Sequence, residues 1–363
     1  MKQGLARTLS PVVATLAALA ATGPGAVAQT AAPTAVSPIP RATPIAVYRG
    51  VALWSRQDSR GRYRLVERVG NGPVTQFGIA SRGVPFDVDI GPTSDGRLVA
   101  VYSRCRVDPP AIFFGPPDYG TGKGCDIYRL DLRTLAENRY REVSATDASE
   151  YWPSYWKGRV AFARAYDHKP HYPYLYVKTI MSSAPSTRMP GGQRRECSRV
   201  GGRTTCSDDT KSTPAELELY GSRLGFAWRY QGNGESPQYE IRLDTVGGGH
   251  RRLDAGGGGG LTVLILGWPS FEGGRMYWTR SCFADTGGCV NLRRSFVKAD
   301  YTAHSIQQLR AASPNFVLSH ERDQGVTWVL RDTTGVADCQ GDPPTPSGTC
   351  VIEPLRPDYA PRD

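Results

Sequence analysis

The amino-acid sequence predicts an all-β fold, a six-bladed β-propeller of four-stranded antiparallel blades. A short apolar strand that follows a turn residue recurs six times along the chain, and a strand rich in Tyr and Arg follows it. Successive copies lie roughly 50 to 60 residues apart, a repeat length at which strand-based units indicate propeller blades. No segment shows a sustained helical period. The recurring apolar strands are expected at 50–54, 96–102, 158–164, 222–228, 274–279 and 325–330.

Residues 1–28 have the pattern of a signal peptide. Lys2 and Arg7 precede an apolar run at 9–21, and the small residues at 26–28 form a cleavage signal. The apolar run is too short and too interrupted to span a membrane. We therefore expect an exported protein, secreted or periplasmic, and the alternative is an uncleaved anchor.

The next segment, 29–43, is rich in Pro, Ala and Thr and has no periodicity, which predicts a semi-extended linker. From residue 44 to 363 the composition does not change again, so this part is expected to form one propeller domain. No Cys precedes Cys105, so no lipid anchor is expected at the cleavage site, and no later stretch is apolar enough to span a membrane.

Each repeat can be divided into four strands, because β-branched and aromatic residues alternate with segments of Gly, Pro, Asp and Ser. The innermost strands are expected at 86–90, 151–156, 217–220, 263–266 and 315–318. The recurring apolar strands come second in each blade. The third strands are expected at 63–69, 126–132, 174–180, 239–243, 290–296 and 351–355. The outermost strands are expected at 141–144, 250–253 and 305–309.

Several of these segments resemble the TolB-like, WD-like β-propeller repeat. Residues 92–101 are similar to the turn and strand that read Ser-Pro-Asp-Gly-Arg-x-Ile-Ala-Phe in that family, and 153–162 repeat the match without the Asp. Residues 126–132 resemble its Asp-Ile-Tyr-x-x-Asp-Leu strand, and 143–146 its closing Leu-Thr strand. The resemblance covers about residues 86–180, and the first and last repeats depart most from it. It implies a six-bladed propeller that binds proteins or small ligands, and it implies no catalytic residues.

The eight cysteines fall into four near neighbours in sequence. An even number of Cys in an exported protein predicts disulfides. In three repeats one Cys lies near the end of the second strand and its neighbour lies just before the third strand. Disulfides at these positions would all rigidify the face on which the hairpin turns and the connections between blades lie. The spacing of the cysteines in the sequence does not fit a zinc site. The expected bridges are Cys105–Cys125, Cys197–Cys206, Cys282–Cys289 and Cys339–Cys350.

The last repeat lacks a fourth strand, because only residues 356–363 follow its third strand and two of them are Pro. An unpaired edge there would invite aggregation. We therefore expect the segment before residue 44, around 35–39, to cover this edge.

Sequence motifs for catalysis are largely missing. The chain has no G-x-S-x-G nucleophile motif, and the glycine run at 256–260 is expected to be a surface loop rather than a nucleotide site. Asp87 and Asp89 alternate along an innermost strand and therefore share one face. They could point into the central channel and hold a cation, or they could be solvated channel carboxylates.

The loop between Cys105 and Cys125 is the strongest candidate for a binding surface. It is apolar and rich in Pro, and a disulfide would keep its aromatic side chains ordered, which lowers the entropy cost of binding. The next blade offers more aromatic and His residues on the same face. The alternative is a loop that folds back over the blade edge. The candidate binding residues are Phe113, Phe114, Tyr119, Tyr166, His168, His171 and Tyr172.

Together these features predict a secreted binding module that presents a stapled face to a protein, peptide or glycan. The formal net charge of +10 would favour acidic glycans, cell-wall polymers or anionic headgroups, although it can equally reflect a solvated Arg-rich surface. Nucleic acid is not expected, because the basic residues are scattered and the protein is exported. We expect a monomer with no cofactor, no metal and no catalytic residues. The alternatives are an exported enzyme that acts on glycans or peptides, and a structural spacer at the cell surface.

Overall fold

The structure is a computed structural model in which the chain divides into two compact units, Met1–Thr30 and Ala31–Asp363. All described residues belong to the second unit. The structure describes residues 34–36, 43–110, 117–166, 173–190, 195–208, 213–231, 237–259, 262–272, 275–284, 295–300, 306–310, 317–323, 326–332 and 350–355.

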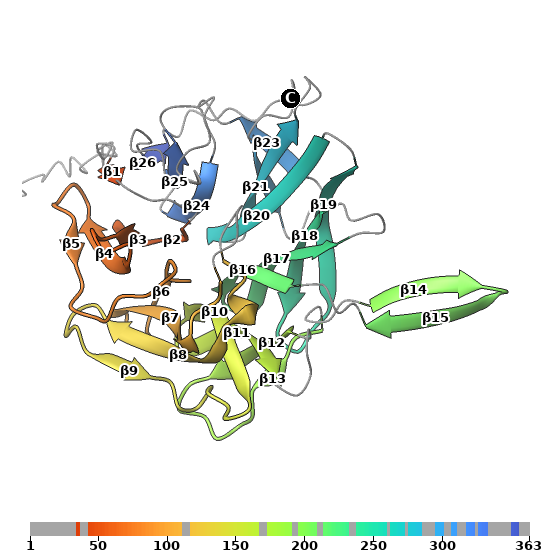
Figure 1. The fold of residues 1–363 in the computed structure, drawn as a ribbon, viewed down its shortest axis with the longest axis horizontal. Coiled ribbons are helices and arrows are strands. Elements are labelled where there is room, and N and C mark those ends of the chain that lie inside the picture. Colours follow the sequence, from red (N-terminus) through yellow and green to blue (C-terminus); the bar gives the residue numbers. More distant parts are fainter. Residues whose placement is uncertain are drawn as a thin grey trace, which may run out of the picture. The chain divides into compact units, whose positions relative to one another are not determined.

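The described strands form antiparallel sheets that follow one another in chain order (Figure 1). The first sheet contains β2 (Ile45–Tyr48), β3 (Val51–Gln57), β4 (Tyr63–Val69) and β5 (Thr75–Gln76). The second contains β6 (Asp89–Pro92), β7 (Leu98–Val107), β8 (Lys123–Asp131) and β9 (Glu137–Arg139). The third contains β10 (Ala148–Trp156), β11 (Arg159–Tyr166), β12 (Pro173–Thr179) and β13 (Thr187–Arg188).

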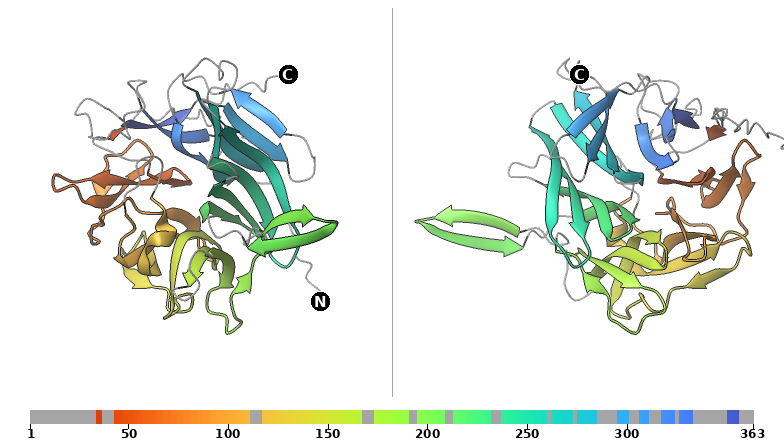
Figure 2. Two further views of the ribbon diagram at one scale, coloured as in Figure 1. Left: turned by 45° about the vertical axis from the view of Figure 1, so that its right-hand side comes forward. Right: turned by 180° about the vertical axis from the view of Figure 1, so that it is seen from behind.

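The rest of the chain forms an eight-stranded sheet, a fourth four-stranded sheet and a hairpin. The eight-stranded sheet begins with β16 (Thr213–Tyr220), β17 (Arg223–Gln231), β18 (Pro237–Thr245) and β19 (His250–Gly259). It continues with β20 (Thr262–Glu272), β21 (Arg275–Ala284), β22 (Ser295–Asp300) and β23 (Ile306–Arg310). The last sheet contains β24 (Val317–Asp323), β25 (Val326–Asp332), β26 (Cys350–Leu355) and β1 (Thr34–Val36). A separate hairpin consists of β14 (Arg195–Val200) and β15 (Arg203–Asp208), visible as a two-stranded ribbon in Figure 2.

The arrangement is all-β and propeller-like, as predicted. The six recurring apolar strands of the sequence coincide with β3, β7, β11, β17, β21 and β25, each second in its set of four strands. The innermost strands contact one another in the order β2, β6, β10, β16, β20 and β24, and β24 contacts β2 again. The short helix η1 (Tyr119–Thr121) is the one helical element among the described residues.

The last sheet takes its outer strand from the N-terminal part of the chain. Thr34 pairs with Ile352, Ala35 with Val351 and Val36 with Cys350. The prediction that this segment covers the unpaired edge is therefore confirmed, and the strand starts one residue earlier than expected. The segment 29–43 is consequently more than a linker, because three of its residues belong to the last sheet.

Two strand predictions were wrong. An outer strand was expected at 141–144, but β9 lies earlier and Val143 instead donates to the carbonyl of Tyr140 in a turn. The glycine run at 256–260 was expected to be a loop, yet β19 extends through Gly259 and pairs with Thr262 of β20. Glycine lacks a side chain that could pack, but its backbone can still form strand hydrogen bonds. The pairing of β19 with β20 joins two sets of four strands into one sheet. Residues 290–294 of the expected third strand lie outside the described residues.

The core lies between neighbouring sheets, and the alternation of side chains along a strand explains why. In β7, Ala100 and Tyr102 are buried against the first sheet, while Val99 and Val101 are buried against the third. The apolar second strand is thus covered on both faces. Two similar clusters lie between the third sheet and β16–β17 and between β17–β18 and β20–β21.

Side chains on the innermost strands accept hydrogen bonds from the backbone of the next strand in the ring. Trp152 N donates to Asp87 Oδ2 at 2.9 Å, and Trp268 N donates to Glu216 Oε2 at 2.6 Å. Both donors have positive φ, 49° and 54°, at irregularities in the pairing of their strands. The same carboxylate-to-amide contact therefore recurs between different blades. At Gly91 the approach is so close that a Cβ would lie 1.9 Å from the carbonyl oxygen of Tyr155.

Candidate functional site

An open pocket of about 400 Å³ lies beside the disulfide of the second sheet. Three segments that are distant in the sequence form it: the β3–β4 turn, the connection from β5 to β6, and the end of β7. We call it the arginine pocket, because four of its lining residues are Arg. Its lining consists of Arg62, Ser81, Arg82, Gly83, Arg104, Cys105, Arg106 and Asp108.

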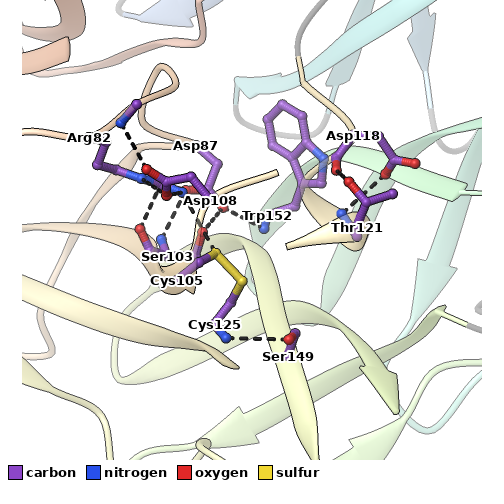
Figure 3. The surroundings of a disulfide bond; sticks show 12 residues. Arg82, Asp87, Ser103, Cys105, Asp108, Asp118, Thr121, Cys125, Ser149 and Trp152 are labelled. Carbon is purple, nitrogen blue, oxygen red and sulfur yellow. Dashed lines mark hydrogen bonds and ion pairs between the residues drawn. A yellow bond between two sulfur atoms is a disulfide. The ribbon is translucent and has the colours of Figure 1, made fainter. Parts of the chain in front are cut away.

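Arg82 forms the floor of the arginine pocket and is 3% exposed. Its Nη1 donates to Asp87 Oδ1 at 3.2 Å and to the carbonyl of Ser103 at 2.8 Å, and its Nη2 donates to Asp108 Oδ1 at 3.1 Å (Figure 3). The backbone of Arg82 pairs in both directions with that of Tyr63. A guanidinium that is buried away from water needs carboxylates and hydrogen-bond acceptors around it to offset the cost of removing its charge from water. Arg82 therefore anchors the β5–β6 connection and supplies little free charge to the pocket.

Cys105 and Cys125 form the predicted disulfide, with an S–S distance of 2.01 Å. The two residues face each other in the pairing of β7 and β8. Cys125 N donates to Ser149 Oγ at 3.3 Å, which connects the bridge to the third sheet (Figure 3). In the chain-entropy account, closure of a loop of this length stabilises the folded state by about 3 kcal/mol. The bridge therefore fixes the wall of the arginine pocket formed by the end of β7.

The other three bridges remain predictions. Cys197 lies directly opposite Cys206 in the β14–β15 hairpin, a placement suited to a bridge across the two strands. Cys282 belongs to β21 and Cys350 begins β26. Their expected partners, Cys289 and Cys339, lie outside the described residues.

The predicted binding aromatics are only partly described. Tyr119 is fully buried, and its hydroxyl donates to the carbonyl of Pro85 at 2.8 Å while its ring packs edge-on against Trp152. Its expected role as an exposed contact residue was therefore wrong, because the loop turns its ring into the space between the second and third sheets. Tyr166 is half-buried, and its hydroxyl lies 3.2 Å from that of Tyr176. Phe113, Phe114, His168, His171 and Tyr172 lie outside the described residues.

Asp87 and Asp89 were expected either to hold a cation in the central channel or to be solvated channel carboxylates. The second alternative was wrong, because both side chains are buried. Asp87 is 1% exposed and bonds Arg82, Ser103 and the backbone of Trp152. Asp89 lies in the same kind of contact, since its Oδ2 accepts from Tyr155 N at 2.7 Å and from Ser154 Oγ at 2.9 Å. Both carboxylates thus join the second sheet to the third.

Burial raises the pKa of Asp89 to about 7, despite the hydrogen bonds from Tyr155 and Ser154 that favour the charged form. Because the folded-state pKa lies above the unfolded value, this group's contribution to stability is present at acidic pH and is lost as the pH rises through 7. We expect the free energy of unfolding to fall by about 2–3 kcal/mol between pH 5 and pH 8 from this group. Asp89→Asn should flatten that slope, measured by urea denaturation across the range.

Asp95→Asn is the control for this experiment. Hydrogen bonds from Thr93 and Arg97 lower the pKa of the exposed Asp95, so its titration lies below the tested range. An unchanged slope in the Asp89→Asn protein would contradict the assignment of the titration to Asp89.

The arginines of the pocket were missed from the sequence. Arg104 and Arg106 flank Cys105 in the sequence. The cysteine indicated that a disulfide lies at this end of β7, and its two neighbours could have been considered with it. Arg62 comes from another sheet, so only the fold brings it to the same pocket. Of the predicted binding residues, only Tyr119 and Tyr166 belong to the described part of the chain, and neither lines this pocket.

The described part of the chain also bears on metal sites and membrane spans. No three His, Cys, Asp or Glu side chains come together there as a group that could hold a metal ion. Within the same ranges, no helix is long and apolar enough to cross a lipid bilayer.

No protein-family model and no curated protein matches the sequence. Among solved structures, the chain is similar to TolB from Acinetobacter baumannii at 14% identity and a TM-score of 0.43, over 84% of this chain and 64% of TolB. It is similar to a puromycin-hydrolysing peptidase from Mycobacterium tuberculosis at 12% identity and a TM-score of 0.44, over 81% of this chain and 50% of the peptidase. A six-bladed fungal lectin from Aleuria aurantia, described with fucose recognition, matches at 9% identity and a TM-score of 0.44, over 87% of this chain and 96% of the lectin. The chain thus spans less than two thirds of the length of the first two proteins.

Proposed function

We propose that the protein is an exported binding module, a six-bladed TolB-like propeller whose stapled face holds a protein, peptide or glycan ligand. By stapled face we mean the face that carries the hairpin turns between second and third strands and the connections between blades. Beside the Cys105–Cys125 bridge, its described part includes Arg62, residues 81–83 and residues 104–108. The observation that carries the proposal is the arginine pocket, which is open and lies in this disulfide-braced region. Rigid surroundings reduce the entropy lost when a ligand binds.

Other features support the finer parts of the proposal. The closed sequence of contacts among six innermost strands supports six blades, with the eight-stranded sheet supplying two of them. The TolB-like assignment rests on the turn and strand motif at 92–101. Export is supported by the pattern of residues 1–28 and by a disulfide, which persists in oxidising compartments. We propose binding rather than catalysis.

The test is a binding screen with the protein from residue 29 onward, against arrays of neutral glycans, charged glycans and peptides. We expect at least one class to bind, and we expect Phe113→Ala with Phe114→Ala to abolish capture without changing the melting temperature. Met181→Ala is the matched control, because this exposed apolar side chain lies in the turn after β12. If the double variant unfolds more easily by several kcal/mol, as truncation of buried Phe does, the loop belongs to the core. Failure of all three array classes to bind would overturn the proposed function.

A further inference from the structure

The arginine pocket holds more positive charge than its own acidic groups balance. Asp108 is the single acidic residue among the described lining residues, and both of its carboxylate oxygens are engaged, by Arg82 and by the backbone of Gly83. Arg82 is further paired with Asp87, so the other three lining arginines, Arg62, Arg104 and Arg106, decide how much positive charge remains available.

Two of these arginines make no ion pair with any described residue. Arg62 is exposed, and its Nη2 donates only to the carbonyl of Ser81 at 2.9 Å. Arg106 is exposed and lies over Gly124, where an added Cβ would stand 3.7 Å from its Nε. The guanidinium groups of Arg62 and Arg106 are therefore free to bind an anion.

The third arginine, Arg104, is held in place, but one of its hydrogen-bond donors has no described partner. The Nε of Arg104 donates to Glu137 at 2.6 Å, and the guanidinium packs over the rings of Tyr102 and Tyr128. Its Nη2 is buried without a hydrogen-bond partner among the described residues. Arg104 is thus fixed by its ion pair with Glu137, and the positive charge left unbalanced among the described lining residues is that of Arg62 and Arg106.

The uncharged part of the lining restricts the chemistry further. Apart from Cys105 and Gly83, every described lining residue is polar, and no aromatic side chain is among these described residues. Such a wall offers neither a stacking surface for a neutral sugar nor an apolar slot for a peptide anchor, which is what peptide hot spots require. Guanidinium groups bind carboxylates in a fork geometry, and the Asp108 carboxylate and the Ser81 carbonyl can accept hydrogen bonds from hydroxyl groups.

We propose that the arginine pocket binds a glycan that carries carboxylate groups, a chain that contains uronic acid. This inference rests on the proposed function and specifies its ligand. A uronic acid presents a carboxylate and several hydroxyls on one ring, which matches the donors of Arg62 and Arg106 and the acceptors beside them. A pocket of about 400 Å³ is within the size range of small-ligand sites.

The test measures binding of oligomers of galacturonic, glucuronic and mannuronic acid by calorimetry, with a neutral galactose oligomer and a polyglutamate peptide as comparisons. We expect at least one uronate to bind, to bind more weakly as salt is added, and to exceed both comparisons. Arg62→Gln with Arg106→Gln should weaken uronate binding by about tenfold or more. Arg133→Gln with Arg203→Gln removes the same charge from two exposed arginines outside the pocket and should change binding little.

Several results would overturn this inference. They are no binding of any uronate, equal binding of the neutral oligomer, tighter binding of the peptide, or equal loss in both double-Arg variants. If the array screen finds a ligand that depends on Phe113 and Phe114 but not on Arg62 and Arg106, the binding function stands and the uronate assignment fails. If no array class and no uronate binds, both fail.

Discussion

Replacing Asp87 with Ala should lower the free energy of unfolding by about 3–5 kcal/mol, because it removes the fully buried one of the two carboxylates that pair with the buried guanidinium of Arg82. The carboxylate of Asp87 accepts four hydrogen bonds: from Arg82, from the backbone and the hydroxyl of Ser103, and from Trp152 N. Its loss would uncouple the second sheet from the third as well as the β5–β6 connection from β7. Urea denaturation of the Asp87→Ala protein, compared with the unchanged protein, measures the effect.

Two further variants separate this explanation from a general cost of losing an aspartate. Asp126 pairs with Arg139 at 2.7 Å in the same sheet, but that Arg is 43% exposed. Asp126→Ala should therefore cost about 0–1 kcal/mol. Arg82→Met combined with Asp87→Ala should restore part of the stability, since no unpaired charge is left buried. An Asp87→Ala protein as stable as the Asp126→Ala protein would refute the role given to this contact.

Removal of residues 29–37 should lower the melting temperature by roughly 5–10 °C, because it deletes β1 from the last sheet. The pairing of three residues contributes about 3 kcal/mol if each backbone hydrogen bond contributes about 1 kcal/mol. The exposed edge of β26 should also promote concentration-dependent aggregation. Calorimetry and light scattering measure the two effects.

The control for this deletion removes only residues 29–33, which precede β1, and should behave like the intact protein. Equal melting temperatures for the two shortened forms would mean that β1 does not support the last sheet.

The fold was largely legible in the sequence because each repeat carries its own local signals. A turn residue followed by apolar alternation located β7 and β11, and the absence of a fourth strand in the last repeat indicated that the N-terminal segment pairs there. Weak outer strands such as β5 and β13 have only two residues and no pattern to detect. The β14–β15 hairpin was not predicted, because it is inserted between two repeats and has no counterpart in the others.

The functional residues were harder to predict because they depend on contacts between repeats. The alternation rule placed Asp87 and Asp89 on one face, but it could not show that the backbone of Trp152 and Tyr155 would cover them. Tyr119 lies in a loop without periodicity, so no sequence pattern could predict its burial against Trp152. The pocket joins Arg62 to the end of β7, which is a consequence of packing between sheets.

The last sheet also constrains the order in which the protein can fold. Its outer strand, β1, is made long before its partner β26, because the other sheets lie between them in the sequence. Contacts between such distant parts of a chain form slowly, since the loop between them must be closed first. The other sheets can assemble from neighbouring strands, but the last sheet needs two segments that are far apart in the sequence. The strand β1 would therefore remain unpaired until β26 has been made, and the pairing of these two strands would be a late step of folding.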